Sequence, residues 1–155
     1  MPRLMIIVGS VRPGRIGLPI ARWVAQQAGQ HGGFDVDFAD LAEIVLPFMD
    51  EPSHPMKHQY TKPHTFAWSK RGASAEQAGG HRQLWRSLRG KPGVTALEPV
   101  LVGVGLVRAG AEVEIPFAAT RLVDGVFVAQ EKNTAVMIKQ LVGLATLAET
   151  LKPLR

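Results

Sequence analysis

Residues 4–17 read Leu4-Met5-Ile6-Ile7-Val8-Gly9-Ser10-Val11-Arg12-Pro13-Gly14-Arg15-Ile16-Gly17, and the rest of the chain is arranged around this run. Its first five residues are all apolar, which predicts a strand buried on both faces, as in a parallel sheet covered by helices on both sides. A glycine-rich turn follows, and after it comes a segment of helical period. This order predicts an α/β fold.

The turn after this strand has the features that an anion needs. Glycines let the backbone come close, and the next helix begins with unpaired N–H groups and the positive end of its dipole. Ser10 adds a hydroxyl group, and Arg12 and Arg15 add two positive charges whose side chains we expect to be exposed. The predicted phosphate site comprises Gly9, Ser10, Val11, Arg12, Gly14, Arg15, Ile16 and Gly17.

The spacing of the turn leaves a second interpretation open. It is neither a Walker A loop nor the dinucleotide fingerprint, because the glycines stand at positions 9, 14 and 17. The turn could instead need glycines for its geometry alone and carry two solvated arginines.

The composition indicates one globular domain over residues 1–155, with enough length for a single core. The chain has no cysteine, which excludes disulfides, thiolate metal sites and cysteine nucleophiles. The net charge of +5 suits phosphate-bearing ligands. The first apolar run is only five residues long, so we expect a cytoplasmic protein with no membrane partner.

The segments that follow the turn complete a β-α-β unit. Residues 17–30 repeat apolar side chains at helical spacing, and Gly32 and Gly33 end the helix. Residues 34–38 then alternate strictly between apolar and acidic, which predicts an edge strand with one wet face.

The middle of the chain is less regular. His54 and His58 have a spacing that suits a metal on a helix, but prolines and the lack of a third ligand argue against one, and we predict no metal site.

Residues 65–70 predict the start of a helix and 81–89 a short basic helix. Residues 71–93 together are interpreted as a basic linker. Nucleic acid is the least favoured partner, because this basic stretch lacks an aromatic stacking platform.

The last third predicts four elements. Residues 94–107 fit either a strand or a helix, and Thr95 and Glu98 as a capping box favour the helix. Residues 111–115 predict a short strand, and Asp124-Gly125 a hairpin turn. Residues 131–151 predict a long helix, whose expected buried stripe is Ile138, Leu141, Val142, Ala145 and Ala148.

Several motifs resemble one family. The turn at 9–17 with Trp23 resembles the NADPH-dependent FMN reductases of flavodoxin-like fold. Two later segments resemble the same family: 46–52, which read Leu-Pro-Phe-Met-Asp-Glu-Pro, and the Tyr60…His64…Trp68-Ser69 run. The end of the chain is similar to the same family in 96–101, 114–117, 124–127 and 151–155.

The resemblance does not extend through the middle of the chain. The family's Pro-Glu-Tyr-Asn and Ser-Tyr-Gly motifs flank the flavin ring, and here the only tyrosine is Tyr60 and the only asparagine is Asn133. Residues 49–93 contain no run that predicts a buried strand. We therefore expect a reduced flavodoxin-like parallel sheet with helices on both faces, in which strands 3 and 4 of the family are missing.

The resemblance implies an enzyme that holds FMN, takes a hydride from NAD(P)H and reduces a flavin, quinone or similar small-molecule acceptor. The flavin itself takes and gives the hydride, so no catalytic side chain is assigned. Because the ring-binding motifs are missing, we expect impaired activity, and the alternative is a non-enzymatic remnant that binds a phosphate or a partner. The reduced sheet also predicts a homo-oligomer, because an unpaired strand edge favours pairing with another chain.

Overall fold

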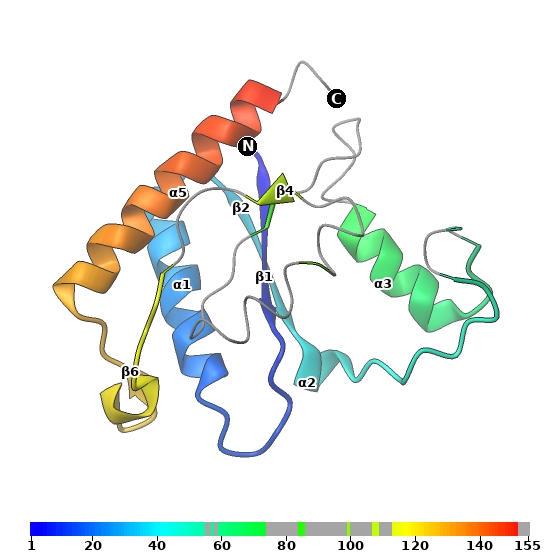
Figure 1. Ribbon diagram of the computed structural model, residues 1–155, viewed down its shortest axis with the longest axis horizontal. Helices are drawn as coiled ribbons and strands as arrows, with labels where there is room; N and C mark the ends of the chain where they lie inside the picture. Colours follow the sequence, from blue (N-terminus) through cyan, green and yellow to red (C-terminus); the bar gives the residue numbers. More distant parts are fainter. Residues whose placement is uncertain are drawn as a thin grey trace.

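The computed structural model describes residues 1–54, 57, 59–73, 84–85, 99, 107–108 and 113–151. At its centre, β1 (Arg3–Val8) pairs in parallel with β2 (Asp35–Asp40) (Figure 1). Arg3 lies opposite Asp35 and Val8 opposite Asp40, so the two strands begin and end level. Helix α1 (Gly17–His31) joins them, which confirms the predicted β-α-β unit.

Helix α1 ends where the sequence predicted. Gly32 adopts the left-handed conformation, with φ 67°, and its N–H donates to the carbonyl of Ala28 at 3.2 Å. This is the usual glycine cap of a helix C-terminus. The predicted buried face is confirmed at Trp23, Val24 and Ala28, whereas Ile20 is only partly buried.

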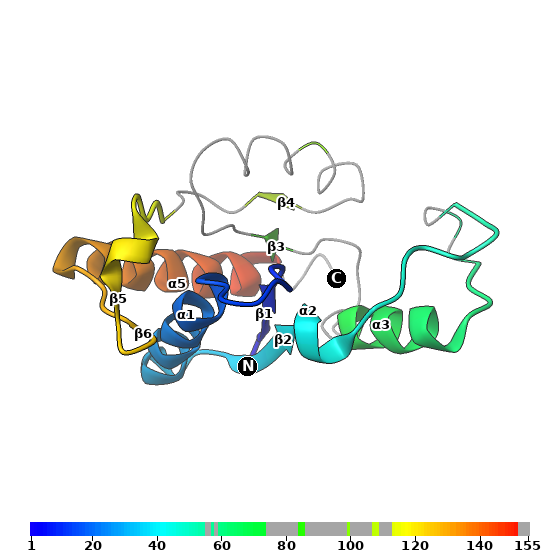
Figure 2. The ribbon, with the colours of Figure 1, turned by 90° about the horizontal axis from the view of Figure 1, so that it is seen from below.

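Helices lie on both sides of the β1–β2 pair (Figures 1 and 2). Helices α1 and α5 (Glu131–Leu151) lie on one side, and α3 (Pro63–Ala73) lies on the other (Figures 1 and 2). Ile6 and Val8 of β1 are buried in the core, whereas Ile7 between them is 53% exposed. The α/β class with helices on both faces is confirmed, but the expectation that β1 is buried on both faces is wrong at Ile7.

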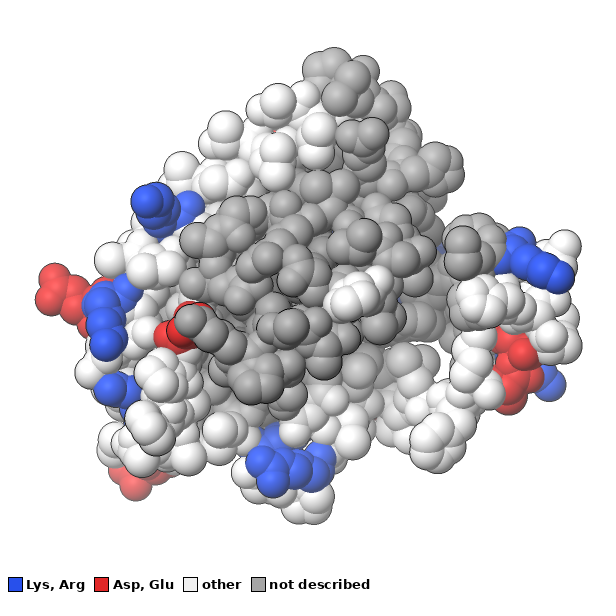
Figure 3. Space-filling model, in the orientation of Figure 1, with Lys and Arg blue, Asp and Glu red and all other residues white. Residues whose placement is uncertain are grey.

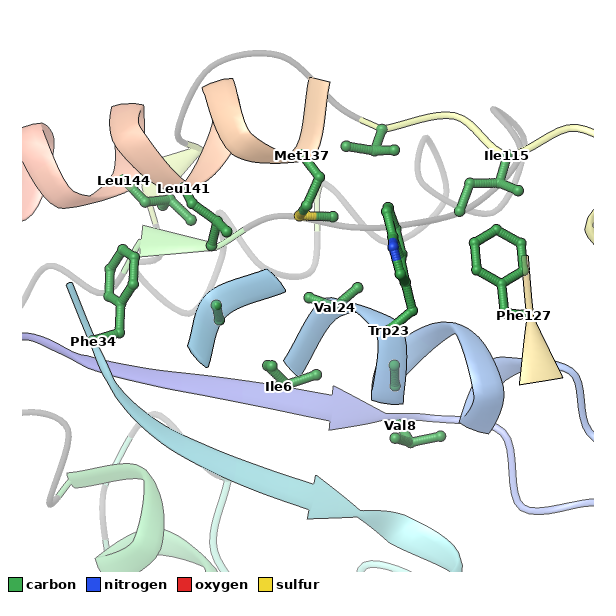
Figure 4. Packing of buried hydrophobic residues seen from close by; sticks show 13 residues of the cluster. Ile6, Val8, Trp23, Val24, Phe34, Ile115, Phe127, Met137, Leu141 and Leu144 are labelled. Atoms are coloured by element: carbon green, nitrogen blue, oxygen red, sulfur yellow. The ribbon is translucent and has the colours of Figure 1, made fainter. Parts of the chain in front are cut away.

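The core lies between α1, α5 and the strands (Figure 4). Trp23 of α1 meets Phe127 edge to face, with ring centroids 5.3 Å apart and planes at 63°. Val113 and Ile115 are also buried in this cluster, and Glu114 between them is exposed. The short strand predicted at 111–115 is therefore wrong at 113–115, because these residues alternate in burial but are not in a strand; 111 and 112 lie outside the described residues.

Helix α5 packs on α1 through a different stripe from the predicted one. Leu141 and Ala148 are buried as expected, together with Met137 and Leu144. Ile138 and Val142 are about half exposed, so the prediction is wrong for these two residues. The apolar run of this helix is wider than one face, and the contact with α1 selects Met137 and Leu144 over them.

Among the described helices, α5 is long and apolar enough to cross a membrane by length and composition alone. The core helix of a soluble α/β protein passes the same test. Helix α5 contacts α1, and 28% of its apolar window is buried.

The predicted hairpin is confirmed. Strands β5 (Leu122–Val123) and β6 (Val126–Phe127) pair antiparallel, after a 3₁₀ turn, η2 (Ala118–Arg121). Asp124 and Gly125 both have positive φ, at 50° and 77°, as a type I′ turn requires.

The middle of the chain differs from its prediction in two places. Strand β3 (Leu84–Trp85) pairs in parallel with β4 (Val107–Arg108). Leu84 and Trp85 are therefore in a strand and not in the predicted basic helix. Pairing between segments distant in sequence has overridden the local helical period. Val107 is likewise in a strand, although Pro99 is helical as expected; the rest of 94–106 lies outside the described residues.

Candidate functional site

The predicted phosphate site is one continuous loop between the end of β1 and the start of α1. Val11, Arg12, Pro13 and Gly14 are exposed at its tip. Blue side chains gather at this lower end of the molecule in Figure 3, where Figure 1 places the loop. The loop leaves the sheet at the carboxyl end of β1, which is where open α/β sheets bind ligands.

Gly14 is the glycine that the loop conformation requires. Its φ is +66°, a region that residues with a Cβ atom rarely adopt. By contrast, a Cβ atom on Gly9 would meet no described residue within 4 Å, and one on Gly17 would make only ordinary contacts with Ser10 and Val8. The backbone geometry therefore explains Gly14 and leaves Gly9 and Gly17 without a steric reason.

The first turn of α1 lacks a side-chain cap. Ile16 occupies the N-cap position and makes no capping hydrogen bond, and the first turn contains no acidic residue. Helix N-terminal N–H groups usually bond to a Ser, Thr, Asp or Asn side chain at this position. Here they remain available to water or to an anion, although Pro19 contributes no N–H.

The structure gives Arg15 a different environment from the one predicted. Its guanidinium group bonds to both carboxylate oxygens of Asp40, one bond measuring 2.6 Å, and its Nη1 also donates to the carbonyl oxygen of Ser10 at 2.8 Å. The side chain is only 14% exposed. The expectation of a solvated Arg15 is wrong, because a carboxylate 25 residues further along the chain holds it.

Asp40 ends β2 and begins α2 (Leu41–Ile44), and it is almost fully buried. Besides the two bonds from Arg15, its carboxylate accepts the N–H of Ala42 at 3.0 Å and so caps α2. The hydrogen bonds from Arg15 lower the pKa of Asp40, and those to Asp40 raise the pKa of Arg15. Both groups are therefore charged across the physiological range.

Arg12 differs from Arg15 in its exposure and in its ionic contacts. It lies at the exposed tip of the loop, and it has no ion-pair partner within the part of the chain that the structure describes. Its charge is thus directed to solvent or to a ligand. Of the two predicted arginines, Arg12 is the one whose side chain is exposed.

A second ionic cluster fastens α3 to the sheet. Asp37 of β2 accepts two hydrogen bonds from Arg71, at 2.6 and 3.1 Å, and one from Arg3 at 2.9 Å. Arg71 also donates to the carbonyl oxygen of Phe38 at 2.8 Å. The hydrogen bonds from Arg71 lower the pKa of Asp37. Arg71 therefore belongs to α3, although it was predicted as the first residue of the basic linker.

The acidic pair in the proline-rich loop also has a structural role. Glu51 accepts the backbone N–H groups of Thr61 and Lys62, at 2.8 and 2.9 Å, and thereby caps the start of α3. Burial alone would raise the pKa of Glu51, but the hydrogen bonds from Thr65, Lys62 and Thr61 lower it to about 2. Asp50 accepts a 2.8 Å bond from His64 of α3.

The structure does not bring the predicted histidines into a metal site. His54 is exposed, and His58 lies outside the described residues. Within the described ranges, no group of three His, Cys, Asp or Glu side chains is arranged to hold a metal ion.

Asp40 was not among the residues predicted for the site. It stands at the end of the alternating strand and directly before a short helical segment, which is a signature of an N-cap residue. That signal predicts its bond to Ala42. Its bond to Arg15 depends on the parallel pairing of β1 with β2, which places the end of β2 beside the loop.

Comparisons with known proteins agree with this part of the fold. A family model described as NADPH-dependent FMN reductase matches residues 2–77. An NAD(P)H-dependent FMN reductase of Schizosaccharomyces pombe is 36% identical over 77 residues, which are 48% of this chain and 38% of that protein. An NAD(P)H-dependent FMN reductase of Nectria sp. is 36% identical over 81 residues, which are 48% of this chain and 40% of the relative.

The aligned part of the chain thus spans about two fifths of the length of these curated relatives. The segment 2–77 that matches the family model contains β1, the loop, α1, β2, α2 and α3, which together form the candidate site and its supports. Residues 2–77, just under half of the chain, are similar to the NADPH-dependent FMN reductase family.

Proposed function

We propose that this chain binds FMN through its phosphate group at the loop 9–17 and uses NAD(P)H to reduce a flavin, quinone or similar small-molecule acceptor. One observation carries the proposal. The helix α1 begins without a side-chain cap behind an exposed loop that carries Arg12, in the segment that matches the reductase family. The helix N-terminus and a fixed cation together suit a phosphate dianion.

The residues present fit the phosphate of FMN. Backbone N–H groups of the first turn of α1, the hydroxyl group of Ser10 and the guanidinium group of Arg12 would hold it. The isoalloxazine ring, when bound, supplies the hydride chemistry, and the protein orients it. Within the described residues we assign no side chain to the ring, because the family's two ring-flanking motifs have no counterpart in this sequence.

The first test is a titration of the purified full chain with FMN and, separately, with riboflavin. FMN should bind at least tenfold more tightly, since the phosphate adds charge-assisted hydrogen bonds of about 1.5–3 kcal/mol. Arg12→Gln should remove most of that difference and leave the fold intact, because the side chain is exposed. Equal affinities for FMN and riboflavin in the unaltered protein would exclude a phosphate site.

Oxidation of NAD(P)H by the FMN-loaded protein is the second test. Turnover with a flavin or quinone acceptor supports an active reductase. Tight FMN binding without NAD(P)H oxidation supports the alternative, a phosphate- or partner-binding module of reductase ancestry.

We also propose that the protein is a cytoplasmic homo-oligomer. Phe48 is 99% exposed, and Val45 and Met49 beside it are exposed as well. An exposed apolar run of this kind favours burial against another protein surface. Light scattering of the purified protein measures the mass, and Phe48→Asp should shift it to that of the monomer if this run forms the contact.

A further inference from the structure

The contact between Arg15 and Asp40 joins three parts of the site. The guanidinium group binds both oxygens of Asp40 at the end of β2, and Nη1 also donates to the carbonyl oxygen of Ser10. Ser10 and Arg15 stand near the two ends of the exposed loop tip. One side chain therefore closes the loop on itself and fastens it to the second strand.

The same contact keeps Arg15 away from a ligand. Asp40 is only 2% exposed, and Arg15 is its cationic partner. Withdrawing the cation would leave a buried carboxylate uncompensated, which is strongly unfavourable. Arg15 would have to leave Asp40 in order to contact a phosphate with its guanidinium group, whereas exposed Arg12 would not.

We propose that Asp40 is the positioning residue of the phosphate loop, and that it acts through Arg15, which shapes the loop instead of binding the phosphate. This inference rests on the proposed FMN phosphate site. Asp40 and Arg15 set the curvature of residues 10–15, and the backbone N–H groups of α1 and the Arg12 side chain make the contacts with the anion.

Two substitutions distinguish this role from a direct contact. Asp40→Asn removes the charge that holds Arg15 and leaves Arg15 free to turn toward a phosphate. Arg15→Lys keeps the positive charge but loses the planar fork that binds both oxygens of a carboxylate. The readout is the ratio of the riboflavin and FMN dissociation constants, measured by quenching of flavin fluorescence, because this ratio isolates the contribution of the phosphate.

If Arg15 shapes the loop, both substitutions break the same contact and have the same effect. Each should lower the ratio about tenfold, the equivalent of one charge-assisted hydrogen bond to the phosphate. The double variant Asp40→Asn with Arg15→Lys should lose no more than either single variant, since the two residues act as a unit. Riboflavin affinity should change by less than about twofold, which shows that the rest of the site is intact.

The opposite pattern overturns the proposal. An Asp40→Asn protein that binds FMN more tightly, together with an Arg15→Lys protein that keeps the unaltered ratio, would show that the Arg15 charge acts on the phosphate directly. Thermal unfolding of each variant detects a general loss of structure. If Asp40→Asn does not fold, Arg15→Lys is the variant to use, because it removes no charge.

Hydrogen exchange in the ligand-free protein separates this inference from the proposed function. Amides of residues 10–16 should exchange faster in both variants than in the unaltered protein, whether or not FMN binds. Unchanged exchange in this loop refutes the positioning role. An unaltered protein with no preference for FMN over riboflavin refutes the proposed phosphate site instead, and the exchange measurement then still decides whether Asp40 orders the loop.

Discussion

Leu141 and Val142 are neighbours on α5 that the structure places in opposite environments. Leu141 is 2% exposed and lies in the core against α1, whereas Val142 is 49% exposed. Helical periodicity had predicted both in the buried stripe. Replacing each of the two residues by alanine tests which face of α5 packs against α1. This packing joins residues 131–151 to the part of the chain that resembles the reductase family.

The expected costs differ by several kcal/mol. Leu141→Ala removes a fully buried side chain and leaves a cavity, so it should lower the free energy of unfolding by about 3 kcal/mol. For a chain of this length, that loss lowers the melting temperature by about 6–12 °C. Val142→Ala loses little burial and gains helix propensity, so its effect should stay within about 0.5 kcal/mol.

Differential scanning calorimetry of the unaltered protein and the two variants measures both quantities. Ile138→Ala is the matched second control, because this half-exposed residue was also predicted to be buried. Losses of equal size for Leu141→Ala and Val142→Ala would refute the packing of α5 described above. A larger loss for Val142→Ala would mean that the helix presents its other face to α1.

Three further predictions concern the loop, the cap of α3 and the core. Gly14→Ala should destabilise the protein by about 1–2 kcal/mol because φ is +66°, and Gly9→Ala, where a Cβ atom meets no described residue, should cost less than half of that in the same urea titration. Because the pKa of Glu51 lies at about 2 in the folded protein and at 4.5 ordinarily, its contribution to stability is present above about pH 4.5 and is lost as the pH falls toward 2. The melting temperature of Glu51→Gln should therefore lie below that of the unaltered protein at pH 7 and approach it at pH 2–3; a constant difference would contradict this role. Gln140→Met should raise the free energy of unfolding by about 1 kcal/mol, because the buried Oε1 of Gln140 has no hydrogen-bond partner among the described residues. A destabilised variant would show that this amide has a role in the core.

Sequence patterns were sufficient for the elements whose signals are local. The apolar run at 4–8, the helical period after Gly17 and the alternation at 34–38 each predicted one element of the β-α-β unit that the structure contains. The Asp124-Gly125 turn was equally clear, because positive φ at two successive positions demands such residues.

Patterns failed where two structures suit the same residues. Leu84 and Trp85 fit one face of a helix, but they pair with Val107 and Arg108 as strands. In α5, apolar residues are too numerous for periodicity to select one face, and the surface of α1 makes the selection.

The loop shows the same division within a single site. Its glycines, its serine and its arginines mark residues 9–17 as a place for an anion, since those properties belong to the residues themselves. The different roles of Arg12 and Arg15, by contrast, do not follow from the residues themselves. Asp40 is 25 residues from Arg15 in the chain and reaches it because β1 and β2 end side by side. Which charge is compensated and which one faces solvent is a property of that strand pairing, and so it emerges with the tertiary structure.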